Sequence, residues 1–90
     1  MTPYGPPSPN AYCIAVPNEC VGLIIGKGGE MIRALQLKSN AKISVAKAMI
    51  PDTNQRNVFV EGPLEAYNIG KKLIDSIVEE HLKLQMSFQT

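Results

Sequence analysis

The chain has 90 residues and a mass of 9.8 kDa, which is room for one small domain and too little for an enzyme with a deep cofactor cleft. Hydrophobic residues make up 44% and charged residues 19%, proportions typical of a folded core rather than of disorder. No run of about 18 apolar residues is present, so we expect no membrane span, and the uncharged, Pro-rich start does not resemble a signal peptide.

Charge is distributed unevenly, although the net charge is only +1. Residues 11–57 carry six basic and three acidic side chains, whereas residues 58–90 carry three basic and five acidic ones. A positive half beside a negative half suggests one face that attracts an anion. Cys13 and Cys20 are too few for a disulfide scaffold, and we expect two reduced, mostly buried thiols. Reduced thiols favour an intracellular location, in the nucleus or the cytoplasm.

The first half of the chain alternates between turn signals and short apolar segments. Residues 1–10 hold four prolines and a glycine, which predicts a flexible lead-in. Residues 12–16 alternate as a short strand, and Asn18 is a good N-cap for a helix of about two turns that ends at Gly26. After the sequence Gly-Lys-Gly-Gly, residues 30–40 predict a second helix, with Met31, Ile32 and Leu35 on its inner stripe and Leu37 as a further candidate.

The second half predicts two strands and a long helix. Residues 41–46 read as a half-buried strand, 47–56 as a loop and 57–61 as a β-branched and aromatic strand. A helix is expected from Pro63 to Leu82. Gly70 lies on its buried side, where glycine lowers helix stability relative to alanine, which suggests that the helix approaches the sheet closely there. Residues 83–90 form a tail that fits a strand, a frayed helical extension or a linker equally well.

The predicted order is therefore β-α-α-β-β-α. Three strands and three helices of this length fit an α+β two-layer sandwich, in which a three-stranded antiparallel sheet packs against three helices. We expect one domain over residues 11–82, preceded by the lead-in and followed by the tail.

The segment that carries chemistry is Gly26-Lys27-Gly28-Gly29, which lies between two predicted short helices. Glycines allow a ligand to approach the backbone closely, the N–H groups at the start of a helix favour a phosphate, and Lys27 adds a positive charge. A Walker A loop and a dinucleotide fingerprint both fail on glycine spacing. A phosphodiester backbone is the ligand that fits best, and a plain helix–turn–helix connector is the alternative.

Three segments of the sequence, VPNECVGLIIGKGGEMIRAL, AKISVA and NVFVEGPLEA, closely resemble the K homology (KH) domain in its eukaryotic, type I arrangement. The resemblance covers about residues 11–82. It implies a groove that binds single-stranded RNA, or single-stranded DNA as the alternative, with the GxxG loop clamping the backbone of about four nucleotides.

Carried over position by position, the resemblance implies a groove with a floor, a clamp and a wall. Its residues are Gly22, Leu23 and Ile25 in the floor, Gly26, Lys27, Gly28 and Gly29 in the clamp, Ile32 beneath a base, Arg33 at a phosphate or base edge, Ile43, Ser44 and Val45 in the opposite wall, and Arg56 at a base. The apolar members could equally be core residues, and the charged ones could be ordinary solvated side chains. Phe59 and Tyr67 are expected in the core, which argues against the aromatic base-stacking platforms of RNA recognition motifs and OB folds.

No catalytic or metal site is predicted. His81 is the only histidine, no CxxC pair is present and no serine has an evident base, so we expect no enzyme activity, no cofactor and no metal. We expect a non-enzymatic module for single-stranded RNA, one of several in a larger protein of post-transcriptional regulation. The alternative is a KH-like module for a weak protein partner or for self-association through the C-terminal helix or tail.

Overall fold

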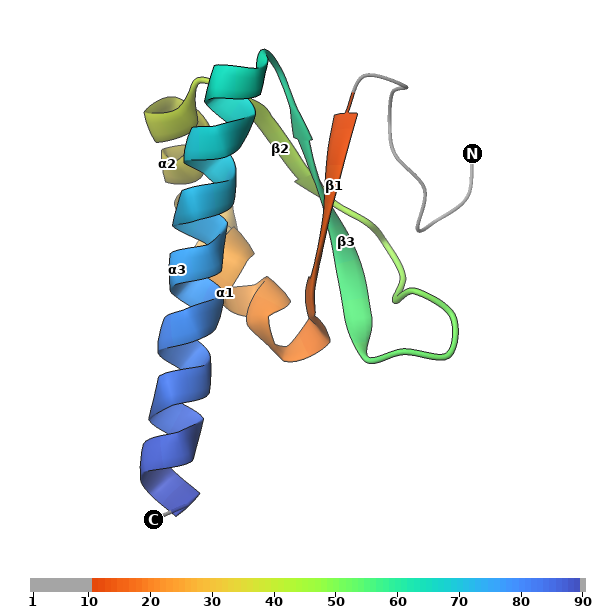
Figure 1. Ribbon diagram of the computed structural model, residues 1–90, viewed down its shortest axis with the longest axis vertical. Coiled ribbons are helices and arrows are strands. Elements are labelled where there is room, and N and C mark those ends of the chain that lie inside the picture. The colour runs from red at the N-terminus through yellow and green to blue at the C-terminus, as the bar shows by residue number, and fades with distance from the viewer. Residues whose placement is uncertain (1–10, 90) are drawn as a thin grey trace.

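The computed structural model describes residues 11–89, with side chains as far as Gln85, so the expected lead-in over 1–10 lies outside the described residues. The elements are β1 (Ala11–Pro17), the 3-10 helix η1 (Asn18–Cys20), α1 (Val21–Ile25), the 3-10 helix η2 (Lys27–Gly29), α2 (Glu30–Ser39), β2 (Lys42–Val45), β3 (Gln55–Glu61) and α3 (Leu64–Gln89). Three strands and three α-helices in the order β-α-α-β-β-α confirm the predicted fold class (Figure 1).

The sheet is antiparallel throughout and has the strand order β1-β3-β2. The central strand β3 pairs with β1 from Ala11 opposite Glu61 to Pro17 opposite Gln55, and with β2 from Lys42 opposite Glu61 to Val45 opposite Val58. β3 is the strand with the β-branched and aromatic sequence, as a strand flanked on both sides requires. β2 has a neighbour on one side only, and its other edge lies toward α2 (Figure 1).

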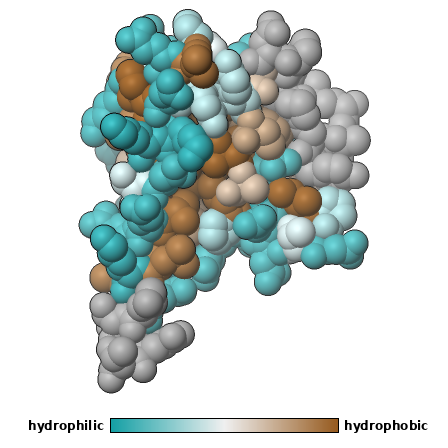
Figure 2. All heavy atoms as spheres, in the orientation of Figure 1, coloured by the Kyte–Doolittle hydropathy of each residue, from teal (hydrophilic) through white to brown (hydrophobic). Residues whose placement is uncertain are grey.

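The core lies between the sheet and the helices. Alternate residues of β1 and β3 point to the same face of the sheet, and these are Ile14, Val16, Val58 and Val60, which are all buried. Ile24 of α1, Leu35 of α2 and Ile74 of α3 close the core from the helical layer. Figure 2 shows the same division from outside, with hydrophilic residues over most of the outer side of α3.

Both expected core aromatics are at least half-buried. Phe59 is buried, but it lies on the face of the sheet away from the helices, opposite Cys13 and Ser44, and so outside the core that the sheet and helices enclose. The half-buried ring of Tyr67 on α3 stacks on Tyr12 of β1 with the ring centroids 4.2 Å apart. Of the two thiols, only Cys20 is buried, and burial raises its pKa. The expectation of a buried Cys13 is wrong, because the pleat of β1 directs Cys13 to the face opposite Ile14, where it is exposed.

Two further predictions about local structure are corrected. Asn18 does not cap a helix, because it is itself the first residue of η1, whose N-cap is Pro17. Met31 and Leu37 do not lie on the inner stripe of α2. Leu37 is 82% exposed, and Met31 is 41% exposed and packs against Gly26 instead. The undecided tail is a helix, since α3 continues to Gln89 without a break.

The close approach predicted for Gly70 is present. A Cβ built on Gly70 would lie 3.3 Å from Val60 Cγ1, 3.6 Å from Ser39 Cβ and 3.8 Å from Ile43 Cδ1. The glycine therefore lets α3 lie against β3, β2 and the end of α2 together.

We predict that Gly70→Ala changes the free energy of unfolding by less than about 1 kcal/mol, because the gain in helix propensity offsets one tight contact. Gly70→Leu should lower it by about 1–3 kcal/mol or more, because the added atoms overpack this contact. Urea unfolding of both variants checks the comparison. Equal effects of the two substitutions would contradict the close approach.

We also predict that the residues after Leu82 are not needed for folding. Residues 82–85 are exposed, and their one described tertiary contact is the 3.3 Å hydrogen bond from Gln85 Nε2 to Glu19 Oε2. Truncation after Leu82 should therefore lower the free energy of unfolding by less than about 1 kcal/mol. Truncation after Ser76 is the matched control, since it removes Ile77 and Val78 from the core and should cost roughly 2 kcal/mol or more in thermal or urea unfolding.

Candidate nucleic-acid interface

The hinge between α1 and α2 is a turn of left-handed glycines. Gly26, Gly28 and Gly29 have φ values of 75°, 64° and 80°. Three amides at the turn are used internally: Gly26 donates to the carbonyl of Gly22 at 2.9 Å, Gly29 donates to the carbonyl of Gly26 at 3.2 Å, and Glu30 donates to the carbonyl of Lys27. The part that faces a ligand is therefore the exposed Lys27 and Gly28 rather than the first amides of α2.

The glycines of the hinge have different reasons to be glycine. Gly26 has φ 75° and ψ 173°, a backbone region restricted essentially to glycine, and a Cβ there would lie 2.6 Å from the Cβ of Met31 and 2.7 Å from its backbone nitrogen. Gly28 has nothing within 4 Å of a built Cβ. Gly26 is thus needed for the tight turn between α1 and α2, whereas Gly28 leaves the outer backbone of that turn uncovered by side chains.

The floor beside the hinge is apolar and partly open. Leu23 is 47% exposed, and Gly22 is exposed with nothing within 4 Å of a built Cβ. Ile25 and Ile32 are half-buried and pack against the core with one side. Arg33 lies beside them at the hinge, where its Nη2 donates to the carbonyl oxygen of Gly28 at 3.5 Å.

The wall on β2 presents main chain rather than side chains. Ala46 N–H donates to the carbonyl of Asn57 at 2.9 Å, so the antiparallel alternation makes Ser44 pair with Phe59 and turns the main-chain groups of Ile43 and Val45 outward. The side chain of Ile43 is only 4% exposed and belongs to the core, while Val45 is half-buried. Ser44 faces the other side of the sheet, so the structure does not bring it to the groove.

Sequence reasoning missed Gln36, whose side chain contacts this wall. Gln36 lies one helical turn after Ile32, on the same stripe of α2, and its Oε1 accepts the N–H of Ile43 at 3.0 Å. The spacing of four residues from Ile32 was the available signal.

Arg56 lies at the far end of the sheet. It is half-buried on β3 opposite Val16, and its Nε makes no hydrogen bond to any described residue. The loop that follows β2 meets η1 here, through the 2.7 Å hydrogen bond from Asn18 N–H to the carbonyl of Asn54. Arg56 is therefore close to the loop and to η1 but separate from the glycine hinge.

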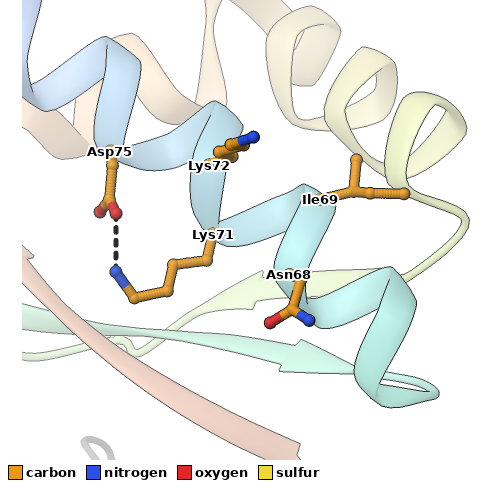
Figure 3. Close-up of a pocket in the computed structure, with 5 residues that line it drawn as sticks. All are labelled: Asn68, Ile69, Lys71, Lys72 and Asp75. Atoms are coloured by element: carbon orange, nitrogen blue, oxygen red, sulfur yellow. Dashed lines mark hydrogen bonds and ion pairs between the residues drawn. The ribbon is translucent and has the colours of Figure 1, made fainter.

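A hollow lies on the outside of α3. Its lining residues all come from that helix: Asn68, Ile69, Lys71, Lys72 and Asp75 (Figure 3). Lys71 Nζ donates to Asp75 Oδ2 at 2.6 Å, and this hydrogen bond raises the pKa of the lysine amine. The charge of Lys71 is therefore paired within its own helix, while Lys72 adds a second positive charge to the lining.

The described residues offer no metal site and no membrane segment. Residues 11–89 contain no group of three or more His, Cys, Asp or Glu side chains placed to hold a metal ion. None of the helices in this range combines the length and the apolarity that crossing a bilayer requires.

Comparison with known proteins places this fold and hinge in a family. Residues 11–76 match the KH domain, and the chain belongs to this family, which is non-enzymatic and binds single-stranded nucleic acids. It is 40% identical over 68 residues to human far upstream element-binding protein 1, 38% identical over 69 residues to human RNA-binding protein Nova-2 and 38% identical over 66 residues to human far upstream element-binding protein 2.

These alignments cover most of this chain and little of the relatives. They span 72%, 74% and 70% of the chain, but only 10%, 14% and 9% of the three relatives. The similarity is thus to one domain-sized part of each relative.

We predict that Gly26→Ala lowers the free energy of unfolding by about 2 kcal/mol or more, because its φ and ψ suit only glycine and its Cβ would collide with Met31. Gly28→Ala has open space around the Cβ and should cost about 1–2 kcal/mol from the positive φ alone. Thermal unfolding of both variants measures the difference, and a Gly28 variant less stable than the Gly26 variant would contradict these separate roles.

Proposed function

We propose that this domain binds single-stranded RNA in the groove between the α1–α2 floor and the edge of β2. The observation that carries the proposal is the hinge itself: an exposed lysine beside a left-handed glycine with open space around its Cα. A sugar–phosphate strand needs such close access to a backbone, together with a positive charge. A clamp of this size holds about four nucleotides.

The groove assigns a different chemistry to each side of the strand. Lys27 and Arg33 face the phosphates, and their charges hold the backbone without reading sequence. The bases turn inward onto Gly22, Leu23, Ile25 and Ile32, where aliphatic packing takes the role that aromatic stacking has in other RNA-binding folds. The outward main-chain groups of β2 pair with a base edge, and Arg56 contacts a base near the loop that follows β2.

Affinity from a single copy should be modest. Few cations surround the hinge, and Glu30 lies directly beside it, so electrostatic attraction to phosphates is limited. Several linked modules would raise the effective concentration of each one. The small share of its relatives that this chain covers supports the proposal that it works as one module of a larger RNA-regulatory protein.

The C-terminal part of α3 supports a second candidate function, self-association or the binding of a protein. Leu82 is 42% and Leu84 57% exposed on the helix beyond the core. The expected pairing of a C-terminal strand with another chain is excluded, because this segment is helical. Sedimentation of the chain with and without residues 83–90 separates this function from RNA binding.

We predict that the double substitution Lys27→Asp/Gly28→Asp lowers affinity for single-stranded RNA by about tenfold or more, because it replaces attraction to phosphate by repulsion and covers the bare backbone. The fold should persist, since both positions are exposed. NMR titration with randomised RNA tetramers, repeated with the deoxyribose forms, measures binding and the RNA preference.

The matched control is Asn68→Asp/Lys72→Asp on the outside of α3, which makes the same change in net charge away from the groove (Figure 3). Its affinity for the tetramers should stay within about twofold of the unmodified chain, because exposed charges this far apart are largely screened. Unchanged titration shifts in the Lys27/Gly28 variant would reject the proposed function.

A further inference from the structure

The strand β1 forms one edge of the sheet and carries none of the usual protections of an edge strand. It pairs with β3 residue for residue from Ala11 to Pro17, so no bulge interrupts it, and none of its seven residues is charged. Soluble proteins usually protect such an edge with charges, bulges or a very short strand. The other edge strand, β2, has four residues and includes the exposed Lys42. The edge of this sheet that is open to another strand is therefore that of β1.

Hydrogen bonds within the sheet determine which residues of β1 have free main-chain groups. Ala46 N–H donates to the carbonyl of Asn57, so the odd-numbered residues of β3 bond toward β2 and the even-numbered ones toward β1. In the one-to-one register with β3, the even-numbered residues of β1 use their main-chain groups inside the sheet. The outward main-chain groups belong to Ala11, Cys13 and Ala15. Within the described range 11–89 these groups have no hydrogen-bond partner. Pro17 fits the same alternation, because at an outward position its missing N–H removes no bond to β3.

The side chains of β1 leave this edge accessible. Cys13 and Ala15 are small and exposed on the face of the sheet away from the helices. Tyr12 lies on the helical face, where it stacks on Tyr67 but remains 39% exposed. The edge therefore offers free main chain beside a partly uncovered aromatic ring.

An antiparallel pairing of two copies of β1 fits this edge. When Cys13 lies opposite Cys13 of the second copy, Ala11 lies opposite Ala15, and the three outward residues pair only with one another. The same register places each Tyr12 opposite Ile14 of the other copy, and pairs of an aromatic with a β-branched residue stabilise antiparallel strands. Because the strand is uncharged, two copies meet without like charges, whereas a charged peptide would find no opposite charge along it.

We propose that two copies of this domain associate through their β1 strands, with Cys13 on the two-fold axis, and join their three-stranded sheets into one continuous antiparallel sheet. The inference does not depend on RNA binding. Because β2 is at the opposite edge of the sheet from β1, the association leaves both proposed grooves open and links them into a bivalent unit. The surface is also different from the C-terminal part of α3, where Leu82 and Leu84 are exposed.

The test places charge at the two-fold position. Cys13→Lys and Cys13→Asp each put like charges directly opposite one another in a homodimer, whereas an equimolar mixture of the two variants puts opposite charges there. Sedimentation equilibrium of the unmodified chain and of each sample, up to about 1 mM, detects even a millimolar dissociation constant. Cys13→Ser is the uncharged control, and thermal unfolding of dilute samples shows whether each variant keeps its fold.

We expect Cys13→Ser to keep the dissociation constant within about twofold, each charged variant to raise it about fivefold, and the mixture to restore it, as one cross-strand charge pair predicts. Ala15→Pro removes an outward N–H and no bond to β3, so it should also weaken association; it replaces the charged variants if they unfold. Truncation after Leu82 should leave association unchanged.

Three results overturn the inference. Charged variants that associate as tightly as the unmodified chain exclude this register, and loss of association on truncation after Leu82 assigns the contact to α3. An unmodified chain that stays monomeric up to about 1 mM excludes a second copy and leaves the edge to an extended segment of another protein.

Discussion

The contact between Gly26 and Met31 is the constraint on which the groove depends. The backbone of α2 approaches Gly26 so closely that only a hydrogen atom fits in place of a side chain. This contact brings the end of α1 against the start of α2, so the apolar residues of both helices lie close to the hinge. Lys27 and Gly28 are exposed because they lie on the outer side of the same sharp turn.

The distance from floor to wall is set by a second tight connection, between α2 and β2. Ser39 is buried, donates its hydroxyl to the carbonyl of Leu35 at 2.7 Å and accepts the N–H of Ala41 at 3.2 Å. Asn40 takes the left-handed conformation between them, with φ 60°. Gly70 packs beneath this connection, against Ser39 and Ile43. The same packing that stabilises the core therefore fixes how α2 lies against β2.

Local sequence was sufficient to predict the structure at positions where a single physical reason accounts for the residue type. Glycines between two helical segments predicted the hinge, β-branched and aromatic residues over 57–61 predicted a strand, and Gly70 on an apolar stripe predicted close packing. Exposure of Cys13 could not be predicted, because it depends on which face of the sheet the helices cover. The buried side chain of Ile43 likewise depends on strand order and register, which local patterns do not contain. For residues 83–89, the period-2 alternation of Leu84, Met86 and Phe88 obscured a composition that favours helix.

The charge around the groove shows where selectivity must arise. Lys27 and Arg33 are exposed at the hinge, but Glu30 begins α2 between them, so the phosphate-directed attraction is small. An interface with little general electrostatic attraction gains most of its affinity from contacts that depend on shape and on hydrogen-bond geometry. Such contacts are effective only if floor and wall keep a fixed separation, because an N–H···O bond weakens steeply as its angle departs from linearity. In this domain that separation depends on Gly26, Ser39 and Gly70, of which only Gly26 belongs to the GxxG loop.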